Sequence, residues 1–301
     1  MNLRAHAKIN LSLAVGGVRP DGYHGLRTVF QSLALHDTLR FVEADEGLAI
    51  ACSAPGVPLD ERNLVWKAAR LVWAAAGRRG EPRGRVRITK RIPAQGGLGG
   101  GSADAAAALV GWDRLWATRL PAGRLRDLAR GLGADVPFFL WAGTALGLER
   151  GDEIHPLDDA PPRWVVLVLP PFGVSTPEAF RWWDEDRDRL TAGGVRLAAP
   201  SGVSPRMPRA ASRKPQADLL AVFNDLEAPV SRRHPELLES RRALEGAGAE
   251  AAAMTGSGST VFGLFGSRLA ARAASDRLRS VARRTIVTRT ATRLQAGLLV
   301  G

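Results

Sequence analysis

The sequence has little of several residue types, and each scarcity removes a class of protein. Cys52 is the only cysteine among 301 residues, so neither an intramolecular disulfide nor a cysteine-based metal cage can form. No apolar run approaches the roughly 18 residues that a membrane-spanning helix needs. Lys8, Asn10 and Ser12 interrupt the apolar residues near the N-terminus, which is unlike a signal peptide. We therefore expect a cytoplasmic protein with no membrane partner.

Lysine is also scarce, although the chain is strongly basic. The formal net charge is +12, yet the only lysines are Lys8, Lys67, Lys90 and Lys214, so arginine carries nearly all of the positive charge. The arginines are scattered along the chain. No long basic run is interleaved with the stacking aromatic residues that single-strand binders use. We expect solvated arginines and no nucleic-acid partner, while an anionic small molecule is compatible with this charge.

The first fifteen residues alternate between apolar and polar side chains, which predicts a strand. This period of two places Lys8 and Asn10 on one face. The opposite face carries Leu3, Ala5, Ala7, Ile9, Leu11, Leu13 and Val15.

Further along the chain, strand-like and helical patterns are mixed, which indicates an α+β protein. Strands are predicted over 28–35, 38–44, 85–92, 164–169, 249–254, 261–265 and 285–290. Helices are predicted over 61–76, 103–116, 121–132, 217–230, 235–245 and 267–283, with another beginning at Thr176. We expect two domains, 1–157 and 158–301. Residues 184–215 mix charges, Gly, Pro and Ser without periodicity, which predicts an exposed loop.

The glycine-rich segment 96–102 lies between a predicted strand and a predicted helix. Backbone N–H groups and the helix dipole favour bound phosphate at such a place, and glycines let a phosphate approach the backbone closely. The segment is not a Walker A loop, because no Lys-Ser/Thr pair follows its last glycine. It also lacks the third glycine of a dinucleotide-binding fingerprint. A flexible linker is the alternative interpretation.

Three segments in the same order resemble the motifs of the GHMP kinases, a superfamily that includes galactokinase, homoserine kinase and mevalonate kinase. Ala7–Leu11 resembles the N-terminal motif, and Met254–Phe262 resembles the C-terminal glycine-rich motif, with Gly256, Ser257 and Gly258 at its centre. The central phosphate-binding motif is represented by Pro93, Ala94, Gln95, Gly96, Gly97, Leu98, Gly99, Gly100, Gly101, Ser102 and Ala103. The resemblance implies that these eleven residues bind ATP.

Within that superfamily the chain resembles the 4-diphosphocytidyl-2-C-methyl-D-erythritol kinases. The residues that carry this resemblance are Arg19–His24 and Gly133–Phe139. It implies transfer of the γ-phosphoryl group of ATP to the 2-hydroxyl of that substrate, which gives the 2-phosphate and ADP, on the non-mevalonate route to isoprenoid precursors. It also implies a ribosomal-protein-like βαβ ATP-binding domain over 1–157. A ferredoxin-like C-terminal substrate domain is implied over 158–301.

The same resemblance implies two catalytic residues. Asp135 follows a predicted helix and a glycine, where a carboxylate can project into a cleft, and would be the general base for the acceptor hydroxyl. A helix cap ahead of Pro137 is the alternative role for Asp135. Lys8 would polarise the hydroxyl and stabilise both Asp135 and the transferring phosphoryl group. Without the motif, a solvated strand lysine is the plainer interpretation.

Substrate binding is implied for residues on both sides of the predicted domain boundary. In the family pattern a tyrosine stacks on cytosine and the following histidine reads its polar edge, which assigns these roles to Tyr23 and His24. Phe180 is the candidate for the other face of the cytosine, although a core position beside its tryptophan neighbours is an alternative. Asn10 and Thr176 complete the implied substrate site.

ATP is the implied phosphate donor, and Mg²⁺ is expected with it because the phosphates need charge neutralisation. The sequence identifies no metal ligand beyond a position for Ser102 near the ion. Another GHMP kinase acting on homoserine or mevalonate is one alternative function, and a basic RNA-binding module of related βαβ fold is another. The expected partner is a small molecule carrying a cytidine diphosphate group, bound by a monomer or weak homodimer.

Overall fold

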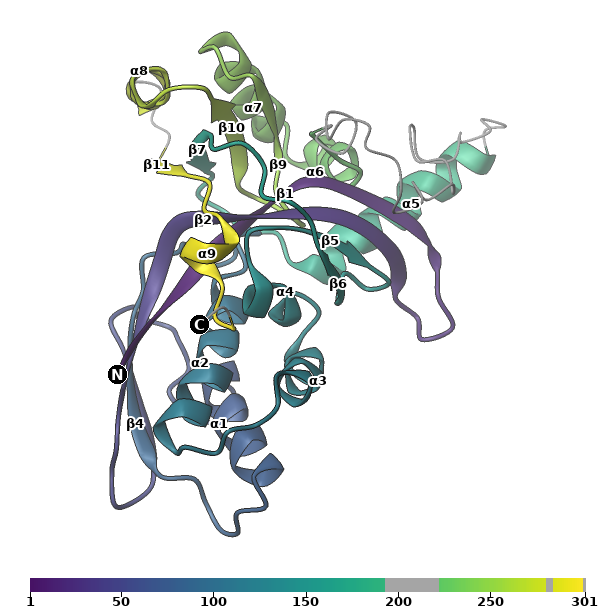
Figure 1. Ribbon diagram of the computed structural model, residues 1–301. Helices are drawn as coiled ribbons and strands as arrows, with labels where there is room; N and C mark the ends of the chain where they lie inside the picture. The colour runs from purple at the N-terminus through teal and green to yellow at the C-terminus, as the bar shows by residue number, and fades with distance from the viewer. Residues whose placement is uncertain (193–221, 280–283, 300–301) are drawn as a thin grey trace.

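The computed structural model describes residues 1–192, 222–279 and 284–299, which form two β-sheets flanked by helices (Figure 1). The long hairpin of β1 and β2 runs across the middle of the molecule. Helices α1 to α4 lie below this hairpin in Figure 1, and the second sheet with its helices lies above it. The structure therefore contains both sheets and helices, which confirms the predicted α+β class.

The first sheet is built around the hairpin and has seven strands. Its strand order is β3-β4-β2-β1-β8, and β5 pairs with both β2 and β6. Bonding is antiparallel except between β3 and β4 and between β1 and β8. The strands are β1 (Asn2–Val18), β2 (His24–Val42), β3 (Leu48–Cys52), β4 (Gly84–Thr89), β5 (Thr144–Leu148), β6 (Glu153–Pro156) and β8 (Phe223–Asn224).

Four helices cover one face of this sheet: α1 (Leu64–Ala75), α2 (Gly100–Leu115), α3 (Ala122–Leu132) and α4 (Val136–Trp141). The side chain of Asn63 caps the start of α1 by accepting from the backbone N–H of Val65 at 2.9 Å. Helix α2 is rich in alanine and is buried over most of its length. Its small side chains allow a close approach to the sheet, so that Gly111 lies directly against the Phe41 ring. This contact holds α2 close against β2.

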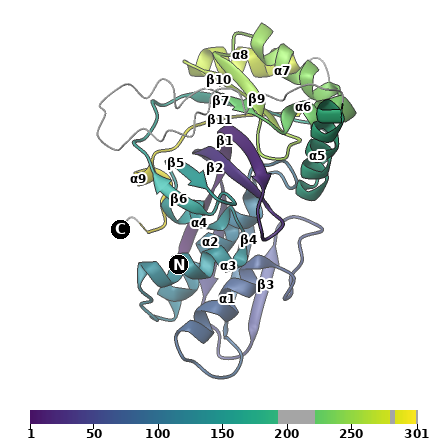
Figure 2. The same ribbon diagram turned by 90° about the vertical axis from the view of Figure 1, so that its right-hand side faces the viewer.

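The second sheet is antiparallel throughout, with the order β11-β7-β10-β9. Its strands are β7 (Trp164–Leu169), β9 (Ala251–Met254), β10 (Val261–Phe265) and β11 (Arg284–Arg289). The helices of this half are α5 (Thr176–Ala192), α6 (Glu227–Arg233), α7 (Glu236–Gly246) and α8 (Arg268–Arg279). In Figure 2, α6, α7 and α8 lie at the top and α5 runs down the right-hand side. A short helix, α9 (Arg293–Ala296), returns to the first half.

The two sheets pack against one another, which buries both faces of β1. Ala7, Ile9 and Leu11 share an apolar cluster with residues of β7, β9 and β10, whereas Ala5 belongs to the cluster beneath the helices. A register shift lies between His6 and Lys8, where an irregularity in the ladder changes the face that a side chain occupies. The predicted strand is therefore confirmed. The prediction that only one of its faces is apolar and buried is wrong, because the strand lies between two cores.

Several predicted elements differ from the observed ones. The strands predicted over 28–35 and 38–44 are one continuous strand, β2. The helix predicted over 217–230 is wrong at residues 223 and 224, which form β8, and α6 begins only at Glu227. Residues 217–221 of that helix lie outside the described residues. The loop predicted over 184–215 is wrong as far as Ala192, because α5 continues to that residue, and residues 193–215 lie outside the described part.

The chain crosses between the two sheets once after β6 and returns to the first sheet later. Strand β6 ends at Pro156 and β7 begins at Trp164, so this crossing brackets the predicted boundary at 157. Strand β8 pairs in parallel with β1, and α9 also contacts the first half. The division into 1–157 and 158–301 stays a prediction. Among the described residues, no helix combines the length and apolar character needed to cross a bilayer.

Candidate active site

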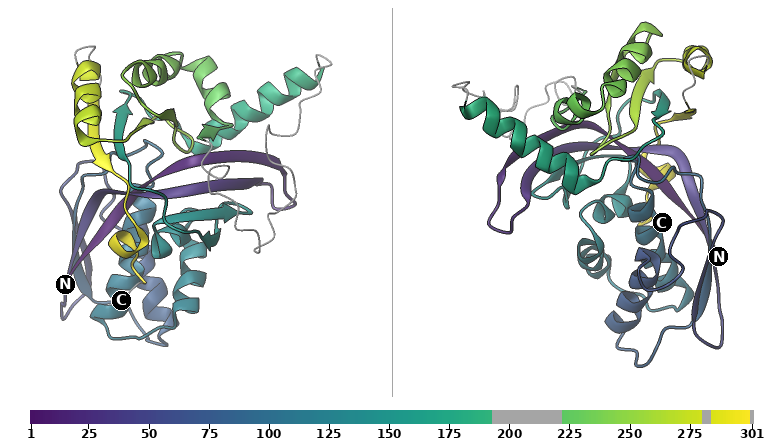
Figure 3. Two further views of the ribbon diagram at one scale, coloured as in Figure 1. Left: turned by 45° about the horizontal axis from the view of Figure 1, so that its top comes forward. Right: turned by 180° about the vertical axis from the view of Figure 1, so that it is seen from behind.

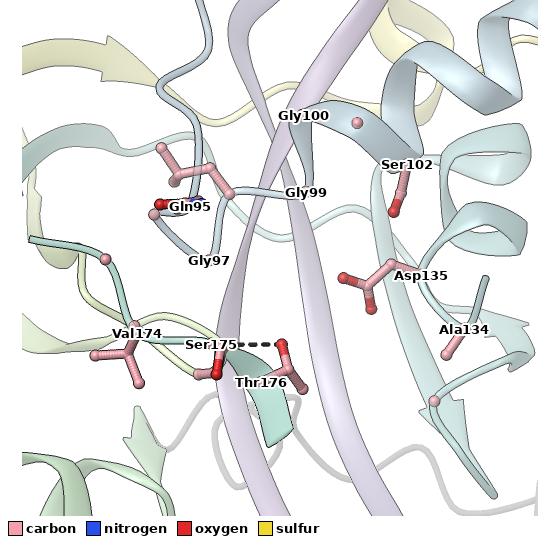
Figure 4. Close-up of a pocket in the computed structure, with 18 of the residues that line it drawn as sticks. Gln95, Gly97, Gly99, Gly100, Ser102, Ala134, Asp135, Val174, Ser175 and Thr176 are labelled. Carbon is pink, nitrogen blue, oxygen red and sulfur yellow. Dashed lines mark hydrogen bonds between the residues drawn. The ribbon is translucent and has the colours of Figure 1, made fainter. Parts of the chain in front are cut away.

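A cavity of about 1290 Å³ opens between the two halves of the molecule (Figure 4). Pockets for one drug-sized ligand usually have about 300–1,000 Å³, so this cavity is large enough for two substrates together. Ala103 is fully buried in the core and does not line the cavity. The other predicted site residues do line it, namely Lys8, Asn10, Tyr23, His24, Pro93, Ala94, Gln95, Gly96, Gly97, Leu98, Gly99, Gly100, Gly101, Ser102, Asp135, Thr176, Phe180, Gly256, Ser257 and Gly258.

The central glycine-rich loop leads into the N-terminus of α2. Gly99 occupies the cap position with φ of 71°, a left-handed conformation that glycine adopts without strain, and no described side chain caps the helix there. A Cβ at Gly99 would lie 2.6 Å from the Phe139 ring. The first backbone N–H groups of α2 are therefore free to bind an anion in the cavity.

The C-terminal glycine-rich segment packs directly on the central loop. A Cβ at Gly97 would lie 2.1 Å from the carbonyl oxygen of Thr255, so the two loops touch through their backbones. The Thr255 hydroxyl accepts from the backbone N–H of Asn10 at 3.1 Å. Further out, the hydroxyl groups of Thr176 and Ser257 are 3.1 Å apart, which connects the same loop to the start of α5. Four segments that are distant in sequence, namely the two glycine-rich loops, β1 and the start of α5, are thus connected here.

Lys8 and Asp135 meet at the floor of the cavity. The Lys8 ammonium lies 3.5 Å from a carboxylate oxygen of Asp135 and donates to the Asn10 side-chain oxygen at 2.7 Å. The Lys8 side chain is only 4% exposed, whereas that of Asp135 is 36% exposed. Asp135 lies between α3 and α4, and its side chain points into the cavity (Figure 4). No side-chain cap bond from Asp135 to α4 is present, which argues against the capping role.

A second charged cluster lies beneath the N-terminus of α2 and was not predicted. The Lys90 ammonium donates to carboxylate oxygens of Asp37 and Asp104, the latter at 2.7 Å. Burial raises the pKa of Asp104 to about 7, although Lys90 acts in the opposite direction. Burial works against the charge of Lys90, but the two carboxylates prevail and raise its pKa. The other Asp104 oxygen has no hydrogen-bond partner among the described residues.

The opposite end of the cavity carries the aromatic side chains. His24 stacks on Phe180, with ring centroids 5.0 Å apart, and its Nε2 lies 2.9 Å from the Asp184 carboxylate. Both partners come from α5, which lies beside the β1–β2 hairpin (Figure 3). Tyr23 is 59% exposed, and its ring is covered on one face by the Arg150 guanidinium at 5.4 Å.

Sequence reasoning missed several residues that line the cavity. Lys90 stands shortly before the glycine-rich motif in the sequence and Asp104 directly after it. The signal that could have revealed them was a charged residue on each side of that motif. Arg150 lies in the turn between β5 and β6 and Asp184 lies on α5, and neither position shows a pattern in the sequence. Val57 and Leu64 supply apolar surface next to the phosphate loop.

The fold and the cavity are those of a small-molecule kinase, and comparisons with known proteins agree with this class. Residues 63–143 match the N-terminal domain of GHMP kinases and residues 210–284 match their C-terminal domain. A solved homoserine kinase from Cytophaga hutchinsonii has the same fold at 17% identity, with a TM-score of 0.66 over 98% of this chain and 96% of that one. The predicted two-domain GHMP kinase fold is confirmed.

More similar relatives narrow the class. A 4-diphosphocytidyl-2-C-methyl-D-erythritol kinase from Moorella thermoacetica is 42% identical over 291 residues, which is 96% of this chain and 99% of that protein. The solved structure of a 4-(cytidine 5′-diphospho)-2C-methyl-D-erythritol kinase is 35% identical, with a TM-score of 0.76 over 96% of this chain and 99% of that one. The chain belongs to the family of 4-diphosphocytidyl-2-C-methyl-D-erythritol kinases.

Proposed function

We propose that the chain transfers the γ-phosphoryl group of ATP to the 2-hydroxyl of 4-diphosphocytidyl-2-C-methyl-D-erythritol, in the non-mevalonate pathway. One observation carries the proposal. The Lys8–Asp135 pair lies on the floor of a cavity that has a phosphate-type glycine loop at one end and an aromatic turn at the other. A kinase for a nucleotide-linked alcohol needs these three parts in contact with a single cavity.

The proposed catalytic step uses the exposed carboxylate of Asp135. It accepts the proton of the acceptor hydroxyl while the oxygen forms its bond to the γ-phosphorus, and the bond from that phosphorus to the bridging oxygen breaks so that ADP leaves. The Lys8 ammonium lies next to Asp135 and attracts the negative charge that develops on the transferring phosphoryl group. Because Asn10 and Asp135 both hold the Lys8 ammonium, its position is fixed before substrate arrives.

ATP binding is proposed for the loop from Pro93 to Ser102. The backbone N–H groups at the start of α2 bind the phosphates, and the helix dipole adds to their attraction for negative charge. Ala103 contributes to this site only through packing, because it lies in the core behind the loop. The C-terminal loop supports the central loop from behind through the Gly97 and Thr255 contact.

The cytidyl group is proposed to bind at the aromatic end. Tyr23 has an open ring face there, and His24 and Phe180 are held close to the same part of the cavity. His24 covers one face of the Phe180 ring. A base that stacks on Phe180 would therefore use the opposite face of that ring. Thr176 and Asn10 also line the cavity, which supports their proposed role in binding the groups that link the base to the sugar alcohol.

Mg²⁺ is expected to bind together with ATP. The few oxygen ligands that the cavity offers fit an ion that is bound mainly by the phosphates of ATP. The described residues contain no cluster of three His, Cys, Asp or Glu side chains able to hold a metal by themselves. Mg²⁺ commonly takes one or two protein oxygens together with phosphates and waters. The side chain of Ser102 points into the cavity beside the start of α2 and would supply such an oxygen (Figure 4). The ion would neutralise phosphate charge there.

The test is an ADP-release assay with Mg-ATP and a panel of acceptors. The panel holds diphosphocytidyl-methylerythritol, the same sugar alcohol phosphate without cytidine, homoserine and mevalonate. We expect turnover with the first acceptor alone. Turnover with homoserine or mevalonate would be consistent with a GHMP kinase but would contradict the proposed cytidyl substrate. A cytoplasmic location and a monomeric or weakly dimeric state remain predictions for fractionation and sedimentation measurements.

A further inference from the structure

Two turns at the aromatic end of the cavity are joined to one another. We define the Tyr23 turn as residues 19–23, between β1 and β2, and the Arg150 turn as residues 149–152, between β5 and β6. The backbone N–H of Leu26 donates to the carbonyl oxygen of Glu149 at 2.6 Å. Arg19 forms an ion pair with the Glu149 carboxylate. The Arg150 turn therefore supports the Tyr23 turn from one side.

The Tyr23 turn also has bonds of its own, but they fix its backbone more than its ring. The backbone N–H of Arg19 donates to the carbonyl oxygen of Tyr23 at 2.7 Å. The Asp21 carboxylate accepts from the Tyr23 backbone N–H at 3.1 Å. Tyr23 as a whole is 59% exposed. An exposed ring samples several rotamers unless a neighbouring group selects one of them.

Arg150 is the neighbour that contacts the ring. Its guanidinium lies over the face of Tyr23, 5.4 Å from the ring centroid, and donates to the Asp152 carboxylate at 2.9 Å. The Asp152 side chain is only 10% exposed, so it is a firm anchor for an arginine that is itself 35% exposed. The guanidinium is held across one ring face by attraction between the cation and the π-electrons.

We propose that Arg150 is a positioning residue for base recognition, which acts through Tyr23. By covering one face of the ring, it selects the Tyr23 rotamer and leaves only the opposite face for a stacking base. The inference rests on the proposed function, because it assumes that Tyr23 stacks on the cytidyl group. Arg150 would thus determine affinity for the nucleotide-linked substrate without contacting the reacting atoms.

The test uses Arg150→Met, which keeps the length of the side chain and removes its charge. We expect the KM for the cytidyl substrate to rise about two- to fivefold, with kcat and the KM for ATP unchanged. Arg150→Lys keeps a cation over the ring and should recover part of the loss. Arg126→Met is the matched control, because Arg126 lies over the Trp141 ring at 5.3 Å, outside the cavity, and this variant should leave every constant unchanged.

Two readouts separate positioning from direct substrate binding. In a Tyr23→Ala background, Arg150→Met should add little, whereas an equal further rise in KM would mean that Arg150 contacts the substrate and would overturn the proposal. Tyr23 is the only tyrosine in the chain, so incorporated 3-fluorotyrosine gives one ¹⁹F resonance. Arg150→Met should shift that resonance in the free protein, and Arg126→Met should not.

The two hypotheses fail in different ways. If the unmodified protein does not turn over the cytidyl substrate, the proposed function is rejected and this inference with it. If turnover is normal but the fluorotyrosine resonance of Arg150→Met stays at the position of the unmodified protein, the inference alone is overturned. A shifted resonance together with a higher KM for the cytidyl substrate supports both.

Discussion

The two ends of the cavity are built by different means. At the phosphate end, backbone loops from both halves of the chain touch, and Lys8 is almost fully buried against Asp135 and Asn10. At the aromatic end, Tyr23 is 59% exposed and is held by side-chain contacts from a neighbouring turn. Close packing fixes geometry more firmly than single surface contacts do. The catalytic end is therefore rigid before binding, and the recognition end depends on a few pairwise contacts.

This contrast predicts different kinetic consequences at the two ends. Changes at the phosphate end should lower kcat or disturb the fold, because the reacting groups and the core share the same residues. Changes at the aromatic end should raise KM and leave kcat intact, because that end contributes binding far from the transferred phosphoryl group.

The largest effect is expected at the catalytic carboxylate. Asp135→Ala should lower kcat by about 10²–10⁴-fold, since general base catalysis contributes about that much, while ATP binding stays near normal. Single-turnover kinetics and an ATP-binding titration measure the two quantities. Asp127→Ala is the matched control, because Asp127 is exposed on α3 and its ion pair with Arg130 spans 3.9 Å. Near-normal turnover of Asp135→Ala would refute the assignment of the base.

The next largest effect is expected where the two glycine loops touch. Gly97→Ala places a Cβ 2.1 Å from the Thr255 carbonyl oxygen and forces a residue with φ of 72° into strain of about 1–3 kcal/mol. We expect the KM for ATP to rise about tenfold or more and the protein to lose stability.

Gly131→Ala is the control for that variant. Gly131 lies in α3, and apart from its chain neighbours and the backbone of that helix no described atom lies within 4 Å of the position of its Cβ. The change should leave kinetics unaltered and stabilise the fold by about 0.4–1 kcal/mol. If both glycine variants behaved alike in ATP binding, the contact between the loops would have no functional importance.

A smaller effect is expected at the aromatic end. Tyr23→Ala should weaken binding of the cytidyl substrate by about 1–3 kcal/mol, the usual value for base stacking on an aromatic side chain, and leave kcat at saturation unchanged. Calorimetric titration with the substrate measures the loss. Unchanged affinity would place the stacking site elsewhere. A large fall in kcat would remove the contrast between the two ends of the cavity.

The resemblance to family motifs pointed to residues at both ends of the cavity. Lys8, the glycine loops and Asp135 lie in such motifs at the phosphate end, and Tyr23 and His24 lie in one at the aromatic end. Arg150 and Asp184 act through contacts with residues far away in the chain, and no local pattern marks such pairs. For the fold, the periodicity of apolar residues was sufficient to locate most strands and helices.

Three features of the fold depend on contacts that periodicity does not contain. The register shift between His6 and Lys8 moves β1 from one core to another, and the pairing of β8 with β1 turns part of an expected helix into a strand. The pair of Asp37 and Asp104 around Lys90 joins three separate elements. Tertiary packing overrides local preference in each case.

The last predicted effect is on stability and not on kinetics, and it concerns this buried cluster and its dependence on pH. The folded protein raises the pKa of Asp104 from its ordinary value of 3.8 to about 7. The native state therefore holds a proton between about pH 4 and 7 that the unfolded chain has released. The stability that Asp104 contributes is full below pH 4 and is lost as pH rises to about 7. Asp104→Asn cannot titrate and escapes this loss.

Urea unfolding at pH 5, 6, 7 and 8 measures the difference between Asp104→Asn and the unmodified protein. We expect the variant to gain about 2–3 kcal/mol of unfolding free energy relative to the unmodified protein as the pH rises from 5 to 8. Asp60→Asn is the control, because the hydrogen bond from Arg62 lowers the pKa of exposed Asp60 to about 2, below this range. Its difference from the unmodified protein should stay constant from pH 5 to 8. A constant difference for Asp104→Asn would mean that Asp104 stays ionised beside Lys90, so that the phosphate end rests on a fully charged triad.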